Sequence, residues 1–389
     1  MAPLDRRTAA VAVAGMCNFL NLYTPQAILP ALTDSFGVAP ARTGLTITAP
    51  LLAVALVAPF VGTISDRLGR KSLISGACLL LVIPTLLVAG SASLEAMLLW
   101  RFLQGLLLPF IFAVTVAYIG DECEGAAGIR TAGIYSAGTI LGGFGGRFIA
   151  GMVSDVSTWR VAFVVVAALT LAGGLFITWA LPREQRFRPV RGGVRATLAT
   201  YREHLANPRL LATCAVGFGM LFSNVATFTF VNFHLAAPPY SLSPGALGLV
   251  FTVYLLGIVT TTIATRLAVR IGRLRTLALA IGMACGGLLL TLLPSIAWAI
   301  AGLAGLSGGL FVVQALCLGY IGVAVRRAKS TAVGVYVTLY YIGGALGGIL
   351  PGFVFHAAGW AGVVSLIVAV LSTTLAIAAL AWREPPAPA

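Results

Sequence analysis

The segment at residues 62–71 reads Gly-Thr-Ile-Ser-Asp-Arg-Leu-Gly-Arg-Lys, and it sets one acid, three bases and two glycines between two long apolar runs. Asp66 could hold the positive N-terminal end of a neighbouring helix while it pairs with an arginine. Gly62 would let another helix approach closely, and Gly69 suits a turn with unusual backbone angles. The spacing therefore predicts a charged hinge that can hold two parts of the molecule together.

A solvated basic loop would account for Arg67 and Lys71 in this segment but not for the acid and the glycines.

Arg101 and Arg147 form a second group, because each lies within an apolar run that is otherwise uncharged. Arginine inside a membrane span is costly and indicates function. The alternative for both is a side chain that extends to the membrane surface. Arg147 could bind an anionic or polyhydroxylated substrate.

The elements that must position these residues are apolar helices. The chain is 59% hydrophobic and only 9% charged, unlike an ordinary soluble domain. Runs of about 20 apolar residues predict membrane-spanning helices, because lipid leaves backbone groups no other partners. Twelve spans are expected, at about 8–33, 43–65, 72–94, 96–119, 127–150, 161–181, 210–235, 246–265, 275–293, 296–320, 331–355 and 361–382.

Basic residues indicate the orientation. Alternate connections carry nearly all of them, whereas the remaining connections hold only Arg42 and Arg160. The positive-inside rule then places both termini in the cytoplasm. The net charge of +14 follows from this topology and requires no nucleic acid as a partner. We expect the basic loops to meet the anionic headgroups of a lipid bilayer at the cytoplasmic face.

The sequence repeats at a shift of about 201 to 203 residues. Ile134-Tyr135, Gly142-Gly143, Gly151 and Trp159 correspond to Val335-Tyr336, Gly343-Gly344, Gly352 and Trp360. Each copy holds six spans, so the repeat is parallel. We expect a bundle of six helices over residues 1–182, a basic cytoplasmic linker over residues 183–208 and a second bundle over residues 209–389.

These features resemble the major facilitator superfamily across all twelve spans. Residues 62–71 match its loop motif between spans two and three, G-x-x-x-D-R-x-G-R-[KR], at every defined position. The resemblance implies that Asp66 contacts span eleven in the outward-open state and that Arg70 faces Asp121 or Glu122. The second copy carries Val269 where an acid would fall, so the expected conformational latch is one-sided. Its residues are Gly62, Asp66, Arg67, Gly69, Arg70 and Lys71, with Asp121 and Glu122 as partners.

Span four also resembles a motif of this family. Arg101-Phe-Leu-Gln104-Gly105 is similar to R-x-x-q-G, which is implicated in proton transfer in proton-coupled members. If protons drive transport, the titrating group should be Asp34, Asp66, Asp121, Glu122 or a histidine. The expected coupling residues are Arg101, Gln104, Gly105 and Asp34.

Span five carries small residues every three or four positions, a pattern that predicts close helix packing. It is similar to the glycine-rich motif of drug/proton antiporters, but Thr139 stands where those proteins have proline. The form Gly-Gly-x-x-Gly-Arg looks like the YnfM-like branch, which is grouped with bacterial sugar or arabinose efflux proteins. The expected helix-interface glycines are Gly138, Gly142, Gly143, Gly146, Gly343, Gly344 and Gly347.

By analogy with the family, spans one, four, seven and ten should line a substrate cavity. Their polar side chains suit a small, partly polar organic solute, or they only bridge neighbouring helices. The candidates are Asn18, Asn21, Tyr23, Gln26, Arg147, Asn224, Thr227 and Gln314.

The sequence thus predicts an all-α integral membrane protein with this family's fold, a monomer in a bacterial inner membrane. We expect a secondary transporter that exports sugars or drugs by alternating access, with protons as the coupling ion. The alternative is a proton-independent facilitator or importer of a neutral metabolite. HExxH, GxSxG and Walker sequences are absent, so we expect no enzyme, no cofactor and no metal site.

Overall fold

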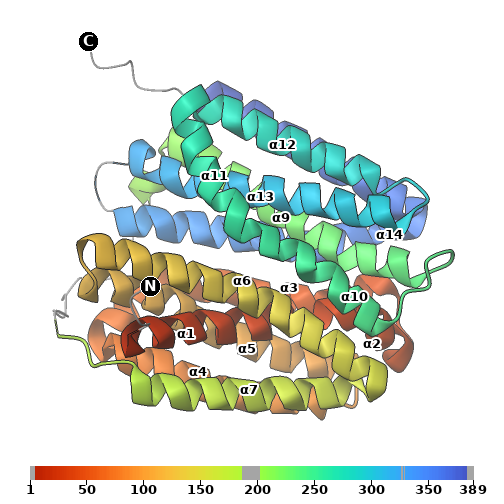
Figure 1. Ribbon diagram of the computed structural model, residues 1–389, viewed down its shortest axis with the longest axis horizontal. Coiled ribbons are helices and arrows are strands. Elements are labelled where there is room, and N and C mark those ends of the chain that lie inside the picture. Colours follow the sequence, from red (N-terminus) through yellow and green to blue (C-terminus); the bar gives the residue numbers. More distant parts are fainter. Residues whose placement is uncertain (1–4, 186–201, 326, 328, 383–389) are drawn as a thin grey trace. The chain divides into compact units, whose positions relative to one another are not determined.

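The computed structural model describes residues 5–185, 202–325, 327 and 329–382, and this part of the chain is helical without strands (Figure 1). The predicted all-α class is confirmed. In chain order, the elements are α1 (Arg6–Tyr23), η1 (Thr24–Ile28), α2 (Leu29–Phe36), α3 (Pro40–Leu68), α4 (Arg70–Ala89), α5 (Leu94–Glu122), α6 (Gly125–Val156), α7 (Trp159–Ala180), α9 (Pro208–Ala236), α10 (Pro244–Val250), η2 (Phe251–Leu255), α11 (Leu256–Ile271), α12 (Arg273–Leu290), α13 (Ile296–Ala324) and α14 (Lys329–Ala381).

Each of the twelve predicted spans falls mainly on helical residues. Among the described residues, nine helices are long and apolar enough to cross a membrane. α1 and α6 are not among these nine, and α14 counts once although it covers two predicted spans. These two spans run on as one helix because a single residue, Gly359 with φ 60° and ψ −156°, makes the bend between them. That combination of angles is accessible almost only to glycine.

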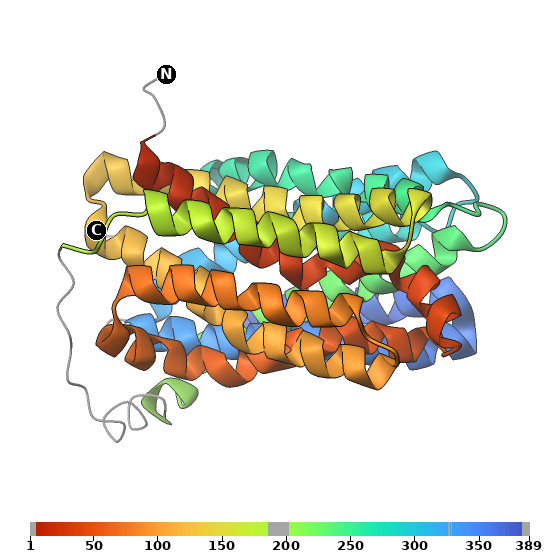
Figure 2. The ribbon, with the colours of Figure 1, turned by 90° about the horizontal axis from the view of Figure 1, so that it is seen from below.

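The chain forms two compact units. The first holds Met1–Gly192 and Phe228–Ile258, and the second holds Gly193–Thr227 and Val259–Ala389. In the first unit α6 packs on α1 and α7, and it also contacts α10 and η2. Figure 2 shows α7, in lime green, beside the red α1 of the same unit. In the second unit α12 packs on α13 and α14.

The first predicted span is one run in the sequence but three elements in the structure. α1 begins at the N-cap Asp5, whose carboxylate accepts the Thr8 amide at 2.7 Å. Hydrogen bonds from the hydroxyl and amide of Thr8 lower the pKa of Asp5. The α-helix then gives way to the short 3-10 helix η1. Pro25 and Pro30 lie in the first turns of η1 and α2, where a residue without an N–H is tolerated.

Glycines on α6 set how closely α1 can approach. Cβ atoms built at Gly138, Gly142 and Gly146 would run into the backbone of Ala12, Met16 and Leu20 on α1. The spacing of four residues puts all three glycines on one face of α6.

In the second unit, Gly343 and Gly347 meet the backbone of Phe218 and Phe222 on α9 in the same way. The repeat seen in the sequence thus recurs as a packing contact. Gly344 is buried. Gly143 differs from the expectation, because the first atom that a Cβ there would meet is Nη1 of Arg147, at 3.4 Å, rather than another helix.

The two loops that match in the repeat also share a backbone shape. Gly69 has φ 85° and ψ 151°, and Gly272 has φ 88° and ψ 155°. Each is the residue that precedes a helix, α4 or α12. Positive φ is easily reached only by glycine, so the predicted turn at Gly69 is present in both copies.

Candidate functional site

Arg147 lies in the C-terminal part of α6 and is fully buried. Its Nε donates to Oε1 of Gln26 at 2.7 Å, and its Nη1 donates to the carbonyl oxygen of Gly143 at 2.5 Å. Its Nη2 is buried and has no hydrogen-bond partner among the described residues. By helical rise, Arg147 lies about 14 Å before the end of α6 at Val156. The alternative in which this side chain extends to the membrane surface is therefore wrong.

Three aromatic rings surround the guanidinium group of Arg147. Its Cζ lies 4.3 Å from the ring centroid of Tyr23, 4.8 Å from that of Phe251 and 4.4 Å from that of Tyr254. Tyr23 comes directly before η1 and Gln26 lies within it, whereas Phe251 and Tyr254 belong to η2. Two interrupted helices thus supply the partners of Arg147, and such breaks are frequent at solute sites in transporters. We call these five residues the arginine cage.

Among the described residues, no carboxylate pairs with Arg147 in the arginine cage. The sequence has no acidic residue between Glu203 and Glu384. The ion pairs among the described residues involve Arg42 and Arg70, not Arg147. Cation–π contacts offset part of the cost of burying a guanidinium group. They leave its positive charge without a counter-ion in the part of the chain that the structure describes.

Arg101 of α5 is also fully buried, but each of its side-chain nitrogens has a partner. Nε donates to the carbonyl oxygen of Thr46 at 2.9 Å, Nη1 to that of Asn21 at 2.8 Å and Nη2 to that of Leu22 at 2.5 Å. The last two carbonyls end α1 just before η1. Arg101 therefore binds acceptors that the break in the helix leaves free. This burial rules out the alternative in which Arg101 extends to the surface.

A buried hydrogen-bond network continues from Arg101. Its Nη1 also donates to Oε1 of Gln104 at 2.6 Å, and Nε2 of Gln104 donates to Oγ1 of Thr85 at 2.7 Å. The Thr85 hydroxyl donates to Oδ1 of Asn21 at 2.8 Å, and Nδ2 of Asn21 donates to Oγ1 of Thr170 at 2.8 Å. The network links α5, α4, α1 and α7. Asn21, predicted to line a cavity, thus bridges helices.

The remaining predicted coupling residues lie apart from this network. A Cβ at Gly105 would come within 2.6 Å of the Cα of Pro50, so Gly105 allows α5 to pack closely on α3. Asp34 is exposed near the end of α2 and is not among the partners of Arg101.

Charged residues gather between α3 and α4. Nη2 of Arg70 lies 2.9 Å from Oδ1 of Asp66, and its Nε lies 3.1 Å from Oδ2 of Asp121. Its Nη1 donates to the Ser65 hydroxyl. Of the two acids expected to face Arg70, the structure pairs Asp121 with it. The close helix approach expected at Gly62 is not present within its own unit, because a Cβ there would meet no atom within 4 Å.

Glu184, which the sequence reasoning missed, joins this cluster from the segment after α7. Its carboxylate accepts the backbone N–H groups of Arg70 at 2.9 Å and Lys71 at 3.3 Å, so it caps the start of α4. It fills the space where a Cβ at Gly69 would lie. Glu122 binds the same segment, because its Oε1 accepts the Gln185 amide at 2.9 Å. Nothing in the sequence sets Glu184 apart from other linker charges.

The predicted cavity residues divide between the two units. Tyr23, Gln26 and Arg147 meet in the first unit. Asn18 is buried there, and both polar atoms of its amide lack a partner among the described residues. Asn224, Thr227 and Gln314 are in the second unit, where Gln314 accepts the Tyr336 hydroxyl at 3.1 Å. The buried Thr227 hydroxyl has no partner in the described part of the chain.

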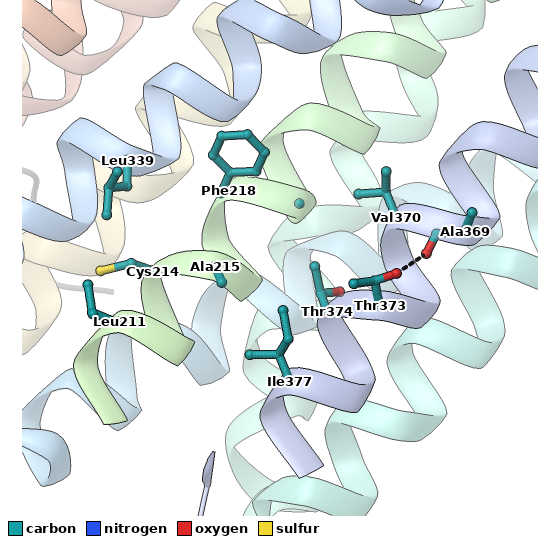
Figure 3. Close-up of a pocket in the computed structure, with 11 residues that line it drawn as sticks. Leu211, Cys214, Ala215, Phe218, Leu339, Ala369, Val370, Thr373, Thr374 and Ile377 are labelled. Atoms are coloured by element: carbon teal, nitrogen blue, oxygen red, sulfur yellow. Dashed lines mark hydrogen bonds between the residues drawn. The ribbon is translucent and has the colours of Figure 1, made fainter. Parts of the chain in front are cut away.

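The second unit also has a cavity of about 520 Å³ between α9 and α14 (Figure 3). Its lining is almost entirely apolar and includes Cys214 and Phe218 of α9 and Val370 of α14. The hydroxyl groups of Thr373 and Thr374 donate to carbonyl oxygens of their own helix, both at 2.8 Å. This surface suits hydrocarbon better than a polar solute.

Comparison with known proteins places the chain in a family. The model of the Major Facilitator Superfamily matches residues 11–238. The inner membrane transport protein YnfM of Escherichia coli is 33% identical over 374 residues, covering 96% of this chain and 89% of that protein. The chain belongs to the major facilitator superfamily. This facilitator-superfamily protein is also 29% identical to an uncharacterized transporter of Buchnera aphidicola, over 92% of this chain and 87% of the relative.

Solved structures agree with the superfamily fold. A bacterial homologue of the human lysosomal transporter Spinster, in an inward-facing and occupied conformation, gives a TM-score of 0.78 at 16% identity, covering 98% of both chains. The nucleoside transporter NupG gives a TM-score of 0.80 at 14% identity, covering 97% of this chain and 100% of that one. These likenesses show the fold, whereas the family match and the relative of 33% identity show that this superfamily protein is a multi-pass membrane transporter of the bacterial inner-membrane type.

The superfamily motif covers the residues of the loop between α3 and α4. It does not include Phe251 or Tyr254, which complete the arginine cage. Phe251 and Tyr254 were not candidates from the sequence, since aromatic residues are ordinary within an apolar span. The change from α10 to η2 has no proline to mark it. Only the position of Arg147 in an apolar run indicated that partners should exist.

Proposed function

We propose that this protein is a secondary active transporter that exports small organic molecules by alternating access, with protons as the coupling ion. The observation that carries the proposal is the arginine cage. Tyr23, Gln26 and Arg147 come from the first predicted bundle, whereas Phe251 and Tyr254 come from the second. Because residues of both predicted bundles enclose the Arg147 guanidinium group, a solute can reach this group only when the two bundles separate around it. Such an arrangement is typical of a solute site between repeats.

The close packing of α6 on α10 supports this motion. A Cβ at Gly151 would lie 3.1 Å from the Cα of Gly248, so the two helices cross almost in backbone contact. Oδ2 of Asp155 accepts the Ser243 hydroxyl at 2.9 Å just beyond this crossing. These contacts hold α6 and α10 together near the C-terminal end of α6. With both termini in the cytoplasm, as the basic loops predict, that end faces outward.

The acids around Arg70 are candidates for coupling. Asp66 and Asp121 share one arginine, and protonation of either acid would weaken its hold on Arg70. Arg101, with Gln104, would influence coupling by fixing the end of α1. The second candidate function is proton-independent transport of a neutral metabolite. It is favoured by the absence of acidic residues between Glu203 and Glu384.

Flux measurements distinguish these two functions. Purified protein is reconstituted into liposomes that contain radiolabelled arabinose, uridine or galacturonate, and efflux is followed with and without an imposed pH gradient. We expect the gradient to accelerate efflux of the transported solute and a protonophore to remove that acceleration. Equal rates under both conditions, above those of protein-free liposomes, would favour the facilitator.

We also propose that Asp66 is a conformational latch, and cysteine labelling tests it. In a background without the six native cysteines, Thr229→Cys reports opening, because Thr229 is fully buried next to Gln26. If Asp66 stabilises the outward-open state by about 1.4 kcal/mol, Asp66→Asn should slow labelling from the outer side about tenfold. The exposed Glu95→Gln is the control, with no change expected. Unaltered labelling of the Asp66 variant would rule out the latch.

A further inference from the structure

The guanidinium group of Arg147 is positively charged at every accessible pH, so its environment must accommodate a cation. It is fully buried, yet the described residues supply it with one amide oxygen, one carbonyl oxygen and three rings, and no anion. Buried charges in proteins are normally paired, because removing an ion from water is costly. The missing partner in the arginine cage is therefore an anion.

Arg101 shows that this chain can pair a buried arginine completely. All of its nitrogens donate, mostly to backbone carbonyl oxygens that are fixed by the helices themselves. The contacts of Arg147 differ in kind. Gln26 and the three rings are side chains that can turn away, and Nη2 is left over. All side-chain nitrogens of Arg101 are thus used in holding helices together. Nη2 of Arg147 has no partner among the described residues and can donate to a bound solute.

The free donor lies on the edge of the guanidinium group that best fits a carboxylate. Nε and Nη2 point the same way and can bind both oxygens of one carboxylate. In this structure Oε1 of Gln26 accepts from Nε at 2.7 Å, and Nη2 beside it is unpaired. The Gln26 amide thus takes one of the two positions that a carboxylate would fill. It is a neutral group that an anion can displace.

We infer that the substrate is an organic monoanion, with a carboxylate that binds the Nε–Nη2 edge of Arg147 in place of Gln26 and an apolar or aromatic body against Tyr23, Phe251 and Tyr254. This inference rests on the proposed transport function and names its substrate class. One negative charge matches the one positive charge in the arginine cage, for which the described residues supply no anion. The three rings make the surroundings of Arg147 aromatic and apolar, which suits a flat or apolar body beside the carboxylate once the cage opens. The carboxylate enters when the cage opens, as alternating access requires.

Matched pairs of compounds test the charge requirement directly. Thermal unfolding of the purified protein in detergent is followed with 4-hydroxybenzoate against 4-hydroxybenzamide, and with cyclohexanecarboxylate against cyclohexanecarboxamide. We expect the carboxylate of at least one pair to stabilise the protein with an affinity at least tenfold above that of its neutral partner. Arg147→Gln should remove this preference. Carboxylates that bind no better than their neutral partners would overturn the inference.

Two substitutions of Gln26 provide a sharper test. Gln26→Glu places a carboxylate of the protein itself on the edge of Arg147, so it should raise the unfolding temperature without ligand and abolish the shift by carboxylates. Gln26→Leu removes the competing amide and should keep that shift or enlarge it. If Gln26→Glu leaves binding of the carboxylate unchanged, Arg147 is not its site.

The outcomes also separate this inference from the proposed function. If the neutral arabinose crosses the liposome membrane through the protein and Arg147→Gln does not slow it, transport stands and the anionic substrate is wrong. If carboxylates bind through Arg147 but none crosses the membrane, the anion site stands and transport of these compounds fails.

Discussion

Replacing Arg101 with glutamine should lower the stability of this protein more than any other single change to a polar residue described above. The change leaves the carbonyl oxygens of Thr46, Asn21 and Leu22 without their donors. Each buried acceptor that loses its partner costs about 1–3 kcal/mol. Three such losses would consume much of a typical stability of about 5–15 kcal/mol. We expect a large fall in the unfolding temperature, measured by tryptophan fluorescence in detergent.

Two further variants make this prediction specific. Arg101→Lys keeps the charge but offers one ammonium group to three separate acceptors, so its unfolding temperature should be intermediate. Arg42→Gln removes an arginine from an exposed pair with Glu95 and should leave the unfolding temperature unchanged. If Arg101→Gln unfolds at the temperature of the parent protein, Arg101 does not support the end of α1. Its role would then have to be sought in coupling alone.

Replacing Gly142 with leucine should also have a severe effect, because it forces α1 and α6 apart. A Cβ at Gly142 would lie 2.6 Å from the Cα of Met16, closer than two carbon atoms that are not bonded to each other can approach. The obstacle is backbone, which cannot turn aside as a side chain can. Overpacking usually costs about 1–3 kcal/mol, and a backbone clash should exceed that range. We expect a low yield of folded protein in size-exclusion chromatography.

Gly145 offers a matched control on the same helix. A Cβ there would meet no atom within 4 Å. Gly145→Ala should therefore raise stability by up to about 1 kcal/mol, since alanine favours helix over glycine. Folded Gly142→Leu protein in normal yield would show that α1 and α6 are not held together at this point. The same variant should disturb the arginine cage, since α1 leads directly to Tyr23 and Gln26.

The sequence predicted the helices well because lipid imposes a strong rule on long apolar runs. It also predicted the glycine face of α6, since Gly138, Gly142 and Gly146 recur every four residues. The pattern could not identify α1 as the partner, because any helix backbone fits such a face. Gly143 was misjudged for a related reason. It adjoins that face in sequence, but it lies next to the side chain of Arg147.

The sites were less predictable than the helices. Arg101 and Arg147 could be recognised as buried cations, but their partners could not. The partners of Arg101 are mostly backbone carbonyl oxygens, which have no sequence signature, and they are available because α1 ends at Tyr23. The cage depends on η2, whose residues look like any apolar span. Glu184 caps α4 at Arg70, which lies 114 residues earlier in the sequence, so no local pattern connects the two residues.

The bend at Gly359 has a mechanical consequence for the second unit. The two segments of α14 share a joint of one residue, with no loop to absorb a change of angle between them. The indole N–H of Trp360 donates to the Thr291 hydroxyl at 2.9 Å, which fastens this joint to the end of α12. A tilt of one segment is therefore coupled to the other segment through one residue, and to α12 through one hydrogen bond. Any movement of this part of the second unit has to pass through the backbone angles of Gly359 or break the contact of Trp360.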